Sequence, residues 1–396
     1  MHDPLLETRF GAAIRHEWDL DPDWLTVNHG SYGATPRVVL AAQREWQRRM
    51  EAQPCRFMGR ELPKALRAAA DQLAAFVGAE GRDLAFVENA TVGCNAVLRS
   101  APLDPGDEIL ALNHGYGAVL KTARYVARRT GALVREARLP FPRPTDAAVV
   151  QSVAAALTPR TRIAVLDHIT SSSALVLPIE QMVATCHAVG VPVLVDGAHA
   201  PGQVALDLTR LDADWYVGNC HKWLMAPKGC AFLWARRDRQ DGLHPVTISH
   251  GYGQGFLAEF DWTGTRDMSA FLAVTAALDF HRRLGGPALQ ARNAALAAEA
   301  TALLAHRLRT ETGSSLPEGK SSVGAMGLVR LPDTENVTPE TALLLRERLL
   351  DAYTDAPVNE LDGTAWLRIS VQAYNELRDF ERLAQVIVQL LCPPPD

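Results

Sequence analysis

Short runs of apolar residues alternate with stretches of helical periodicity over most of the chain. Between about residues 62 and 265 this alternation predicts a mostly parallel β-sheet with helices on both faces. Several of the apolar runs are continuous, as expected for strands that are covered on both sides. We expect strands at 84–87, 108–112, 162–166, 191–195, 215–217 and 231–234.

The two ends of the chain follow other patterns. Residues 1–30 form a polar arm with scattered aromatic residues, followed by a glycine-containing turn and a helix that opens near Pro36. Residues 270–309 are alanine-rich and helical, with a break at 285–287. The remainder reads strand, helix, strand, helix (325–331, 338–351, 365–371, 376–391), a smaller α+β unit. We therefore expect an N-terminal arm (1–45), a large domain (46–268) and a small C-terminal domain (269–396).

Composition narrows the class of protein. The chain has 396 residues, of which 47% are hydrophobic and 21% charged, as in soluble globular proteins of two or three folding units. The net charge of −5 gives no basic face for nucleic acid. No apolar stretch is long enough for a membrane span, and the first residues do not follow a signal-peptide pattern, so we expect a cytoplasmic protein. The six cysteines form no C-x-x-C pair, so we expect reduced thiols and no metal site.

Polar, chemically capable residues follow the predicted strands. In open α/β sheets, ligands bind beyond the carboxyl ends of the strands. Four such ends carry the sequences ENAT (88–91), DHIT (167–170), DGAH (196–199) and GNCHK (218–222). We expect these segments to share one site.

Three features of these strand ends point to one coenzyme. Lys222 is one of only five lysines and precedes an apolar segment that would lower its pKa and make it a nucleophile. Asp196 directly follows an apolar run, where a carboxylate needs a partner. The turn at 89–93 places helix N-terminal amides where they can bind a phosphate, although Asn89 could equally be an ordinary helix cap. An amine, a carboxyl and a phosphate cradle together suit pyridoxal phosphate.

The motifs themselves resemble a known family. Residues 195–202 (VDGAHAPG) and 214–223 (DWYVGNCHKW) are similar to the class V aminotransferase family of fold-type I pyridoxal-phosphate enzymes, and within it to the isopenicillin N epimerase-like branch. Residues 28–33, 88–93, 115–119 and 263–267 fit the same branch. The resemblance runs from about residue 25 to 375. It implies an α/β fold, the fold-type I PLP-dependent transferase, with a mostly parallel sheet, helices on both faces and a smaller C-terminal α+β domain.

The resemblance also implies roles around the coenzyme ring. Lys222 would form the internal aldimine and move the proton at the substrate Cα. Asp196 would pair with the pyridine nitrogen, and His199 would lie near the phenolic oxygen. Tyr116 would stack on the ring face, with His114 as the runner-up because relatives often use a histidine there.

Phosphate and substrate contacts follow in the same way. The phosphate would be held by residues of the turn and of the lysine motif: Ala90, Thr91, Asn219 and His221. Thr265 would reach the phosphate of a neighbouring subunit, which implies a homodimer with shared active sites. The amino-acid substrate would be bound through its α-carboxylate by Arg368, with Asn28, Gly30 and Ser31 beside it. Thr170 and Ser172 could touch the cofactor or substrate, or simply belong to a polar loop.

These roles imply chemistry at the substrate Cα through an external aldimine. We expect an isopenicillin N epimerase-like enzyme of amino-acid metabolism, with a specialised role such as antibiotic biosynthesis. A C–S β-lyase acting on cysteine or its S-conjugates is the nearest alternative, followed by an aminotransferase and by a non-catalytic sensor of the coenzyme or an amine. No cysteine lies between Cys230 and Cys392, and the loop 312–323 carries no thiol, so we do not expect sulfur transfer through an enzyme persulfide.

Overall fold

A seven-stranded sheet forms the centre of the protein. The computed structural model describes residues 10–314 and 324–391. The sheet has the order β2-β8-β7-β6-β5-β3-β4, and β8 is antiparallel to both of its neighbours while the other pairs are parallel. Its strands are β2 (Leu84–Val87), β3 (Glu108–Leu112), β4 (Leu133–Ala137), β5 (Thr161–Asp167), β6 (Val193–Asp196), β7 (Trp215–Asn219) and β8 (Ala231–Ala235). The predicted mostly parallel sheet is confirmed.

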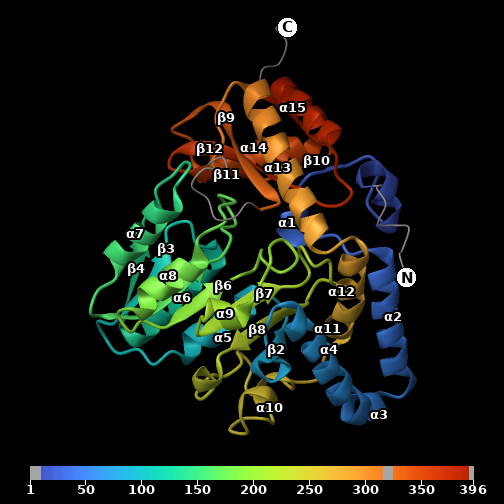
Figure 1. Cartoon of the computed structure of the whole chain (residues 1–396), viewed down its shortest axis with the longest axis vertical. Coiled ribbons are helices and arrows are strands. Elements are labelled where there is room, and N and C mark those ends of the chain that lie inside the picture. Colours follow the sequence, from blue (N-terminus) through green and yellow to red (C-terminus); the bar gives the residue numbers. More distant parts are fainter. Residues whose placement is uncertain (1–9, 315–323, 392–396) are drawn as a thin grey trace.

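Helices cover both faces of this sheet (Figure 1). Along β2, Leu84 and Phe86 pack into one hydrophobic cluster, whereas Ala85 and Val87 pack into another on the opposite face. Successive side chains of a strand point to opposite faces, so this alternation shows a sheet buried on both sides. The helices around the sheet are α4 (Leu62–Phe76), α5 (Ala90–Ser100), α6 (Gly117–Thr130), α7 (Asp146–Ala156), α8 (Ile179–His187), α9 (Leu208–Leu211), α10 (Phe256–Phe260) and α11 (Ser269–Leu272). Helix α2 (Arg37–Ala52) packs on α11 and α12 (Val274–Arg283), α12 packs on α4, and α3 (Pro54–Arg56) follows α2 at the surface.

Strand β4 is the element of this sheet that the hydrophobic pattern does not predict. It is an edge strand that pairs only with β3, and most of its side chains are exposed or half-buried. Its sequence, LVREA, places two charged residues in the middle, which is how edge strands avoid pairing with other chains. Backbone hydrogen bonds rather than burial define it.

A smaller antiparallel sheet lies above the first in Figure 1. It has the order β11-β12-β9 and packs against three helices. Its elements are β9 (Met326–Glu335), β11 (Val358–Leu361), β12 (Thr364–Ser370), α13 (Pro287–Leu308), α14 (Pro339–Asp351) and α15 (Leu377–Leu391). Here β11 was not predicted, while the break before α13 falls at the expected place. The proposed domain boundaries stay predictions.

The N-terminal segment packs against this smaller unit. Strand β1 (Leu25–Thr26) pairs in parallel with β10 (Thr354–Asp355), and a short helix α1 (His29–Tyr32) follows. Short 3-10 or π segments complete the fold at Gly11–Glu17, Phe57–Glu61, Gly81–Asp83 and Arg237–Arg239. Two remote parts of the chain therefore meet beside the central sheet.

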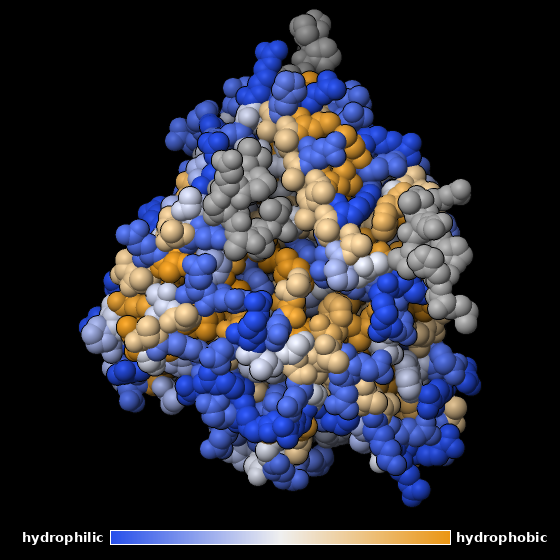
Figure 2. All heavy atoms as spheres, viewed as in Figure 1, coloured by the Kyte–Doolittle hydropathy of each residue, from blue (hydrophilic) through white to orange (hydrophobic). Residues whose placement is uncertain are grey.

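The surface view shows a mixed face. In Figure 2, hydrophilic residues dominate the lower part of the molecule, and hydrophobic residues gather in a band across its middle.

Within the described residues, each helix is too short or too polar to cross a membrane. Cys94, Cys186, Cys220 and Cys230 are buried free thiols, and Cys55 is exposed. Most of the predicted thiol-free loop 312–323 lies outside the described residues.

Candidate active site

A pocket of about 540 Å³ opens at the carboxyl edge of the central sheet. All four polar strand ends singled out in the sequence contribute to it, which is the place that parallel α/β sheets reserve for ligands. It is lined by Ser31, Tyr32, Glu88, Asn89, Ala90, Thr91, Val92, Tyr116, Asp167, Ile169, Ser171, Asp196, Ala198, His199, Asn219, His221, Lys222 and Gly229.

Lys222 lies on a tight turn that follows β7. The His221 Nδ1–H donates to the Cys230 carbonyl at 3.0 Å, and His29 Nε2 lies 3.0 Å from the Lys222 carbonyl oxygen. Gly33, at a φ of +71°, packs on the same turn, and a Cβ at this position would lie 2.0 Å from the His221 carbonyl oxygen. Only glycine suits this backbone conformation and this close approach. The lysine backbone is therefore fixed from both sides.

The amine of Lys222 is buried and titrates near neutral pH. Its pKa lies at about 7 because burial, and then the charge of Arg368, disfavour the ammonium, although Asp196 acts in the opposite direction. His199 Nε2 lies 3.0 Å from Lys222 Nζ, and the Trp223 Nε1–H donates to His199 Nδ1 at 3.3 Å. Burial and Lys222 lower the pKa of His199 well below its ordinary value, so the ring carries one proton. With Nδ1 accepting, that proton lies on Nε2, which donates to the lone pair of a neutral amine.

Asp196 ends β6 and lies 3% exposed beneath the pocket. Its Oδ1 accepts the Ala198 N–H at 3.0 Å. Burial raises its pKa, while the Ala198 N–H and the charge of Lys222 lower it. No salt bridge involves Asp196 within residues 10–314 and 324–391. Its carboxyl has capacity left for a cationic partner in the pocket.

The N-terminus of α5 provides anion-binding donors. The Asn89 side chain accepts the Val92 N–H at 3.0 Å, and Asn219 Oδ1 accepts the Ala90 N–H at 2.8 Å. Asn89 therefore caps the helix and also lines the pocket, so the two alternatives left open by the sequence both hold. Thr91, the second residue of α5, also lines the pocket. Such a helix end favours a bound dianion.

His221 presents its second ring nitrogen to the pocket. Because a carbonyl can only accept, the proton of the neutral ring lies on Nδ1 and Nε2 is a free acceptor. Burial and Lys222 lower the pKa of His221 to about 4. An anion near Nε2 would reverse this preference by favouring the doubly protonated ring.

Tyr116 and His114, the two candidates for the ring face, occupy different environments. Tyr116 is 44% exposed and lines the pocket. His114 is buried outside the lining residues, with Nδ1 at 2.9 Å from Ser173 Oγ and its ring against Phe141. The structure thus brings Tyr116, and not His114, to the pocket.

Arg368 lies behind the pocket wall on β12. Its guanidinium donates to the Ser171 carbonyl at 2.7 Å, to Asn28 Oδ1 at 2.9 Å and to Ser31 Oγ at 2.7 Å. It is 4% exposed, and its Nε has no partner within the described residues. Gly30 allows this packing because a Cβ there would approach Ser370 Oγ to 2.8 Å. Asn28, Ser31 and Arg368 thus form one bonded group, of which Ser31 reaches the pocket.

Two predicted residues lie away from the pocket. Thr170 is fully buried, and its hydroxyl lies 2.8 Å from Ser173 Oγ and accepts the Leu175 N–H at 2.8 Å. It stabilises the loop rather than facing the pocket. Thr265 is exposed and does not line the pocket of its own chain.

Asp167 lines the pocket, although the sequence analysis assigned it no role. It ends β5 and is paired in register with Asp196 across the sheet. It stands first in the DHIT segment, so the rule that selected the strand ends could have found it. The same rule gave no reason to prefer it to Thr170.

Comparisons with known proteins identify the family of this chain. The family model "Aminotransferase class-V" matches residues 32–383. A probable L-cysteine desulfhydrase, chloroplastic, of Arabidopsis thaliana is 35% identical over 93% of this chain and 83% of its own. The isopenicillin N epimerase of Amycolatopsis lactamdurans is 35% identical over 96% of this chain and 98% of its own.

Solved structures share the fold at low identity. The cystine C-S lyase C-DES, in complex with its product cysteine persulfide, has a TM-score of 0.78 and 21% identity over 92% of this chain and 97% of its own. A mutant of C-DES, with a TM-score of 0.78 and 21% identity over 94% and 98%, carries glycine covalently linked to its PLP cofactor. The apo cysteine desulfurase of Thermococcus onnurineus NA1 has a TM-score of 0.79 and 17% identity over 97% and 98%. These likenesses confirm the predicted fold.

Proposed function

Because the chain belongs to the class V aminotransferase family, we propose that it is a pyridoxal 5′-phosphate enzyme that acts at the Cα of an amino acid. The observation that carries this proposal is the buried amine of Lys222, whose pKa is lowered to about 7 and which lines the same pocket as Asp196 and the N-terminus of α5. Relatives at 35% identity are named isopenicillin N epimerase and L-cysteine desulfhydrase.

The residues of the pocket fit this coenzyme. Its aldehyde needs a primary amine, its ring nitrogen a carboxylate and its phosphate a cluster of donors. Lys222, Asp196 and the α5 N-terminus offer these three groups around a space of about 540 Å³. When bound, the coenzyme withdraws electrons from the Cα of an attached amino acid and makes its substituents labile.

Lys222 would bind the coenzyme's aldehyde and would move the proton at the substrate Cα. Its amine suits both tasks because a pKa of about 7 leaves a large neutral fraction near pH 7. His199 holds the amine through its Nε2–H, and Trp223 orients the His199 ring. These contacts fix the direction from which the amine reaches the substrate.

The remaining pocket residues orient the coenzyme and substrate. Asp196 would hold the ring nitrogen protonated, while Thr91, Asn219 and His221, together with Ala90 at the helix end, would hold the phosphate. Arg368 attracts the substrate carboxylate toward Ser31 and Asn28, which its guanidinium already positions. Tyr116 covers the open face of the pocket and excludes water from it.

Epimerisation is the reaction we favour. It needs a proton donor on the face of the substrate opposite Lys222, and the half-exposed Tyr116 is one of two lining tyrosines, with Tyr32, that offer a phenolic hydroxyl. The second candidate is a C–S β-lyase, favoured by the L-cysteine desulfhydrases of Arabidopsis thaliana and Oryza sativa at 35% and 34% identity. The lack of a cysteine between Cys230 and Cys392 argues against a persulfide-carrying enzyme.

One experiment separates these possibilities. The protein is loaded with pyridoxal 5′-phosphate and incubated in D₂O with single amino-acid enantiomers, including cysteine and a peptide with a free α-amino acid end. Deuterium at Cα together with the opposite enantiomer supports the epimerase, whereas pyruvate and sulfide support the lyase. Neither deuterium uptake nor product with any amino acid would refute the enzyme proposal and leave the sensor.

We also infer that the enzyme is a homodimer with shared active sites. Thr265 is exposed and outside the pocket of its own chain, which suits a residue that serves a neighbouring subunit. Sedimentation together with the activity of mixed Lys222→Ala and Thr265→Ala dimers tests this. Complementation in the mixture supports a shared site, and monomers with full activity contradict it.

A further inference from the structure

Asp167 and Asp196 form a side-by-side pair of buried carboxyls. Asp167 is the last residue of β5 and Asp196 the last of β6, and their Cα atoms are direct partners in the parallel ladder. Paired residues of adjacent strands point to the same face, about 4.8 Å apart along the hydrogen-bonding direction. Both side chains line the pocket, and they are 5% and 3% exposed.

Too little positive charge surrounds the pair for both carboxyls to be ionised. The groups that face it are the Lys222 amine, with a pKa of about 7, the buried Cys94 thiol on α5 and the buried Tyr216 hydroxyl on β7. Burial, and then the charge of Asp196, raise the pKa of both Cys94 and Tyr216, so both groups stay neutral and offer no positive charge. Two carboxyls at this spacing in a buried site share one proton.

The local contacts decide which carboxyl keeps the proton. Lys222 and the Ala198 N–H favour the charged form of Asp196. Asp167 accepts the Tyr116 backbone N–H, but burial and the charge of Asp196 raise its pKa well above the ordinary value. The proton therefore lies on Asp167 and the negative charge on Asp196.

We propose that Asp167 is a positioning residue that stays protonated beside Asp196, concentrates the pair's single negative charge on Asp196, and anchors the Tyr116 turn through its backbone N–H. This inference rests on the proposed function, because Asp196 is the group that faces the coenzyme's ring nitrogen. It assigns a task to a lining residue outside the lysine motif. It also connects the ring-nitrogen partner to the loop that carries Tyr116.

Two matched substitutions test the inference. Asp167→Asn imitates a neutral acid and can still accept the Tyr116 N–H, whereas Asp196→Asn removes the charge that the pair is proposed to carry. The affinity for pyridoxal 5′-phosphate is measured by absorbance titration at pH 7. We expect Asp167→Asn to stay within about threefold of the wild type and Asp196→Asn to weaken binding by about tenfold or more. Equal losses for both variants would overturn the inference.

A second readout needs no coenzyme. A carboxyl with a raised folded pKa binds its proton more tightly than in the unfolded chain, so stability falls as the pH rises through the window between these two values. Asp167→Asn removes this contribution. Its melting temperature in the coenzyme-free protein should gain about 2 °C on the wild type between pH 5 and pH 8. A difference that does not change with pH would overturn the proposal.

The wild-type protein provides a check if a variant does not fold. Infrared spectra of the coenzyme-free protein at pH 7 should contain the carbonyl band of a protonated carboxyl that shifts in D₂O. Absence of that band would refute the shared proton. Failure of the wild type to bind pyridoxal 5′-phosphate would instead refute the proposed function, because the infrared and melting measurements do not depend on the coenzyme.

Discussion

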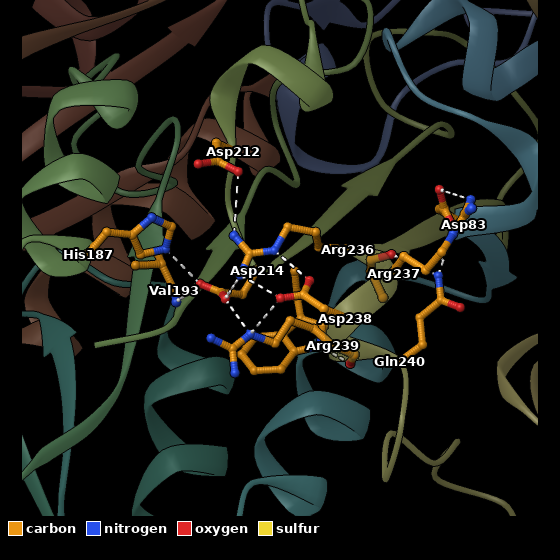
Figure 3. A network of polar contacts seen from close by, with 12 residues as sticks. Asp83, His187, Val193, Asp212, Asp214, Arg236, Arg237, Asp238, Arg239 and Gln240 are labelled. Carbon is orange, nitrogen blue, oxygen red and sulfur yellow. Dashed lines mark hydrogen bonds and ion pairs between the residues drawn. The ribbon is translucent and has the colours of Figure 1, made fainter. Parts of the chain in front are cut away.

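Two buried aspartates at opposite ends of neighbouring strands have contrasting environments. Asp214, at the start of β7, accepts bonds from His187 at 2.8 Å, Arg236 at 2.9 Å, Arg239 at 2.7 Å and the Val193 N–H at 2.7 Å (Figure 3). Asp196, at the end of the neighbouring strand, accepts the Ala198 N–H and no guanidinium among the described residues.

The difference separates structural from functional burial. A buried carboxylate is tolerable when its oxygens are fully paired, and Asp214 meets this condition with groups from α8, β6 and the segment after β8. Asp196 meets it only in part, so its environment favours a ligand that brings positive charge. The end of the sheet that contains Asp214, which we call the structural edge, stabilises the fold. The end that contains Asp196, which we call the functional edge, can bind a ligand.

The largest expected effect is on the functional edge. Lys222→Ala should abolish the absorption band of the lysine-bound coenzyme and lower turnover at least about a thousandfold, as loss of a covalent catalytic group does. Spectroscopy and steady-state kinetics measure this. Lys228→Ala is the matched control, since this exposed lysine lies in the same β7–β8 connection but outside the pocket. Full turnover without Lys222 would remove the basis of the assignment.

The structural edge should respond in stability. Asp214→Asn should destabilise the coenzyme-free protein by about 2–4 kcal/mol, because it removes the negative charge and leaves the donors of one of the two carboxyl oxygens without an acceptor. Urea unfolding measures the change, with Asp212→Asn as the control at an exposed position. The same change at Asp196 should leave stability equal or higher. Equal losses at both positions would contradict the contrast between the edges.

Substrate affinity should depend on the shape of the Arg368 side chain. Arg368→Lys keeps the charge but loses the planar fork that bonds Ser31 and Asn28, so we expect KM to rise about tenfold with a smaller change in kcat. Steady-state kinetics measures both constants, with the amino acid that the D₂O experiment identifies as the substrate. If KM does not change, the carboxylate is bound elsewhere.

The smallest effect concerns the pH at which Lys222 reacts. Only the neutral amine is nucleophilic, so its labelling by an aldehyde under reducing conditions should rise with pH and reach half its limit at about pH 7. Arg368→Gln removes a charge that lowers this pKa, so the midpoint should move upward by a fraction of a pH unit. Mass spectrometry of labelled peptides measures the labelling of Lys222 and, as an exposed reference, that of Lys64. A midpoint shared by both lysines would show that burial has no effect.

Local sequence predicts the parts of this molecule that depend on local burial. The continuous apolar runs gave β2 and β3 at their observed bounds, and the apolar flank of Lys222 gave its lowered pKa. The hydrophobic pattern did not predict strand β4, because backbone pairing rather than burial defines an edge strand. The roles of single strand-end residues depend on register: Asp167 faces Asp196 only because β5 and β6 align there. Likewise, Thr170 is used by its own loop, which no linear pattern reveals.

The bond between Arg368 and Asn28 joins residues 340 positions apart. On a ribosome, the central sheet and the Lys222 turn emerge well before Arg368, and at ordinary synthesis rates the interval is on the order of ten seconds. During that time the N-terminal arm has no partner strand, and the wall behind Ser31 is missing. A newborn chain therefore carries the Lys222 amine before it carries the guanidinium that would attract a carboxylate.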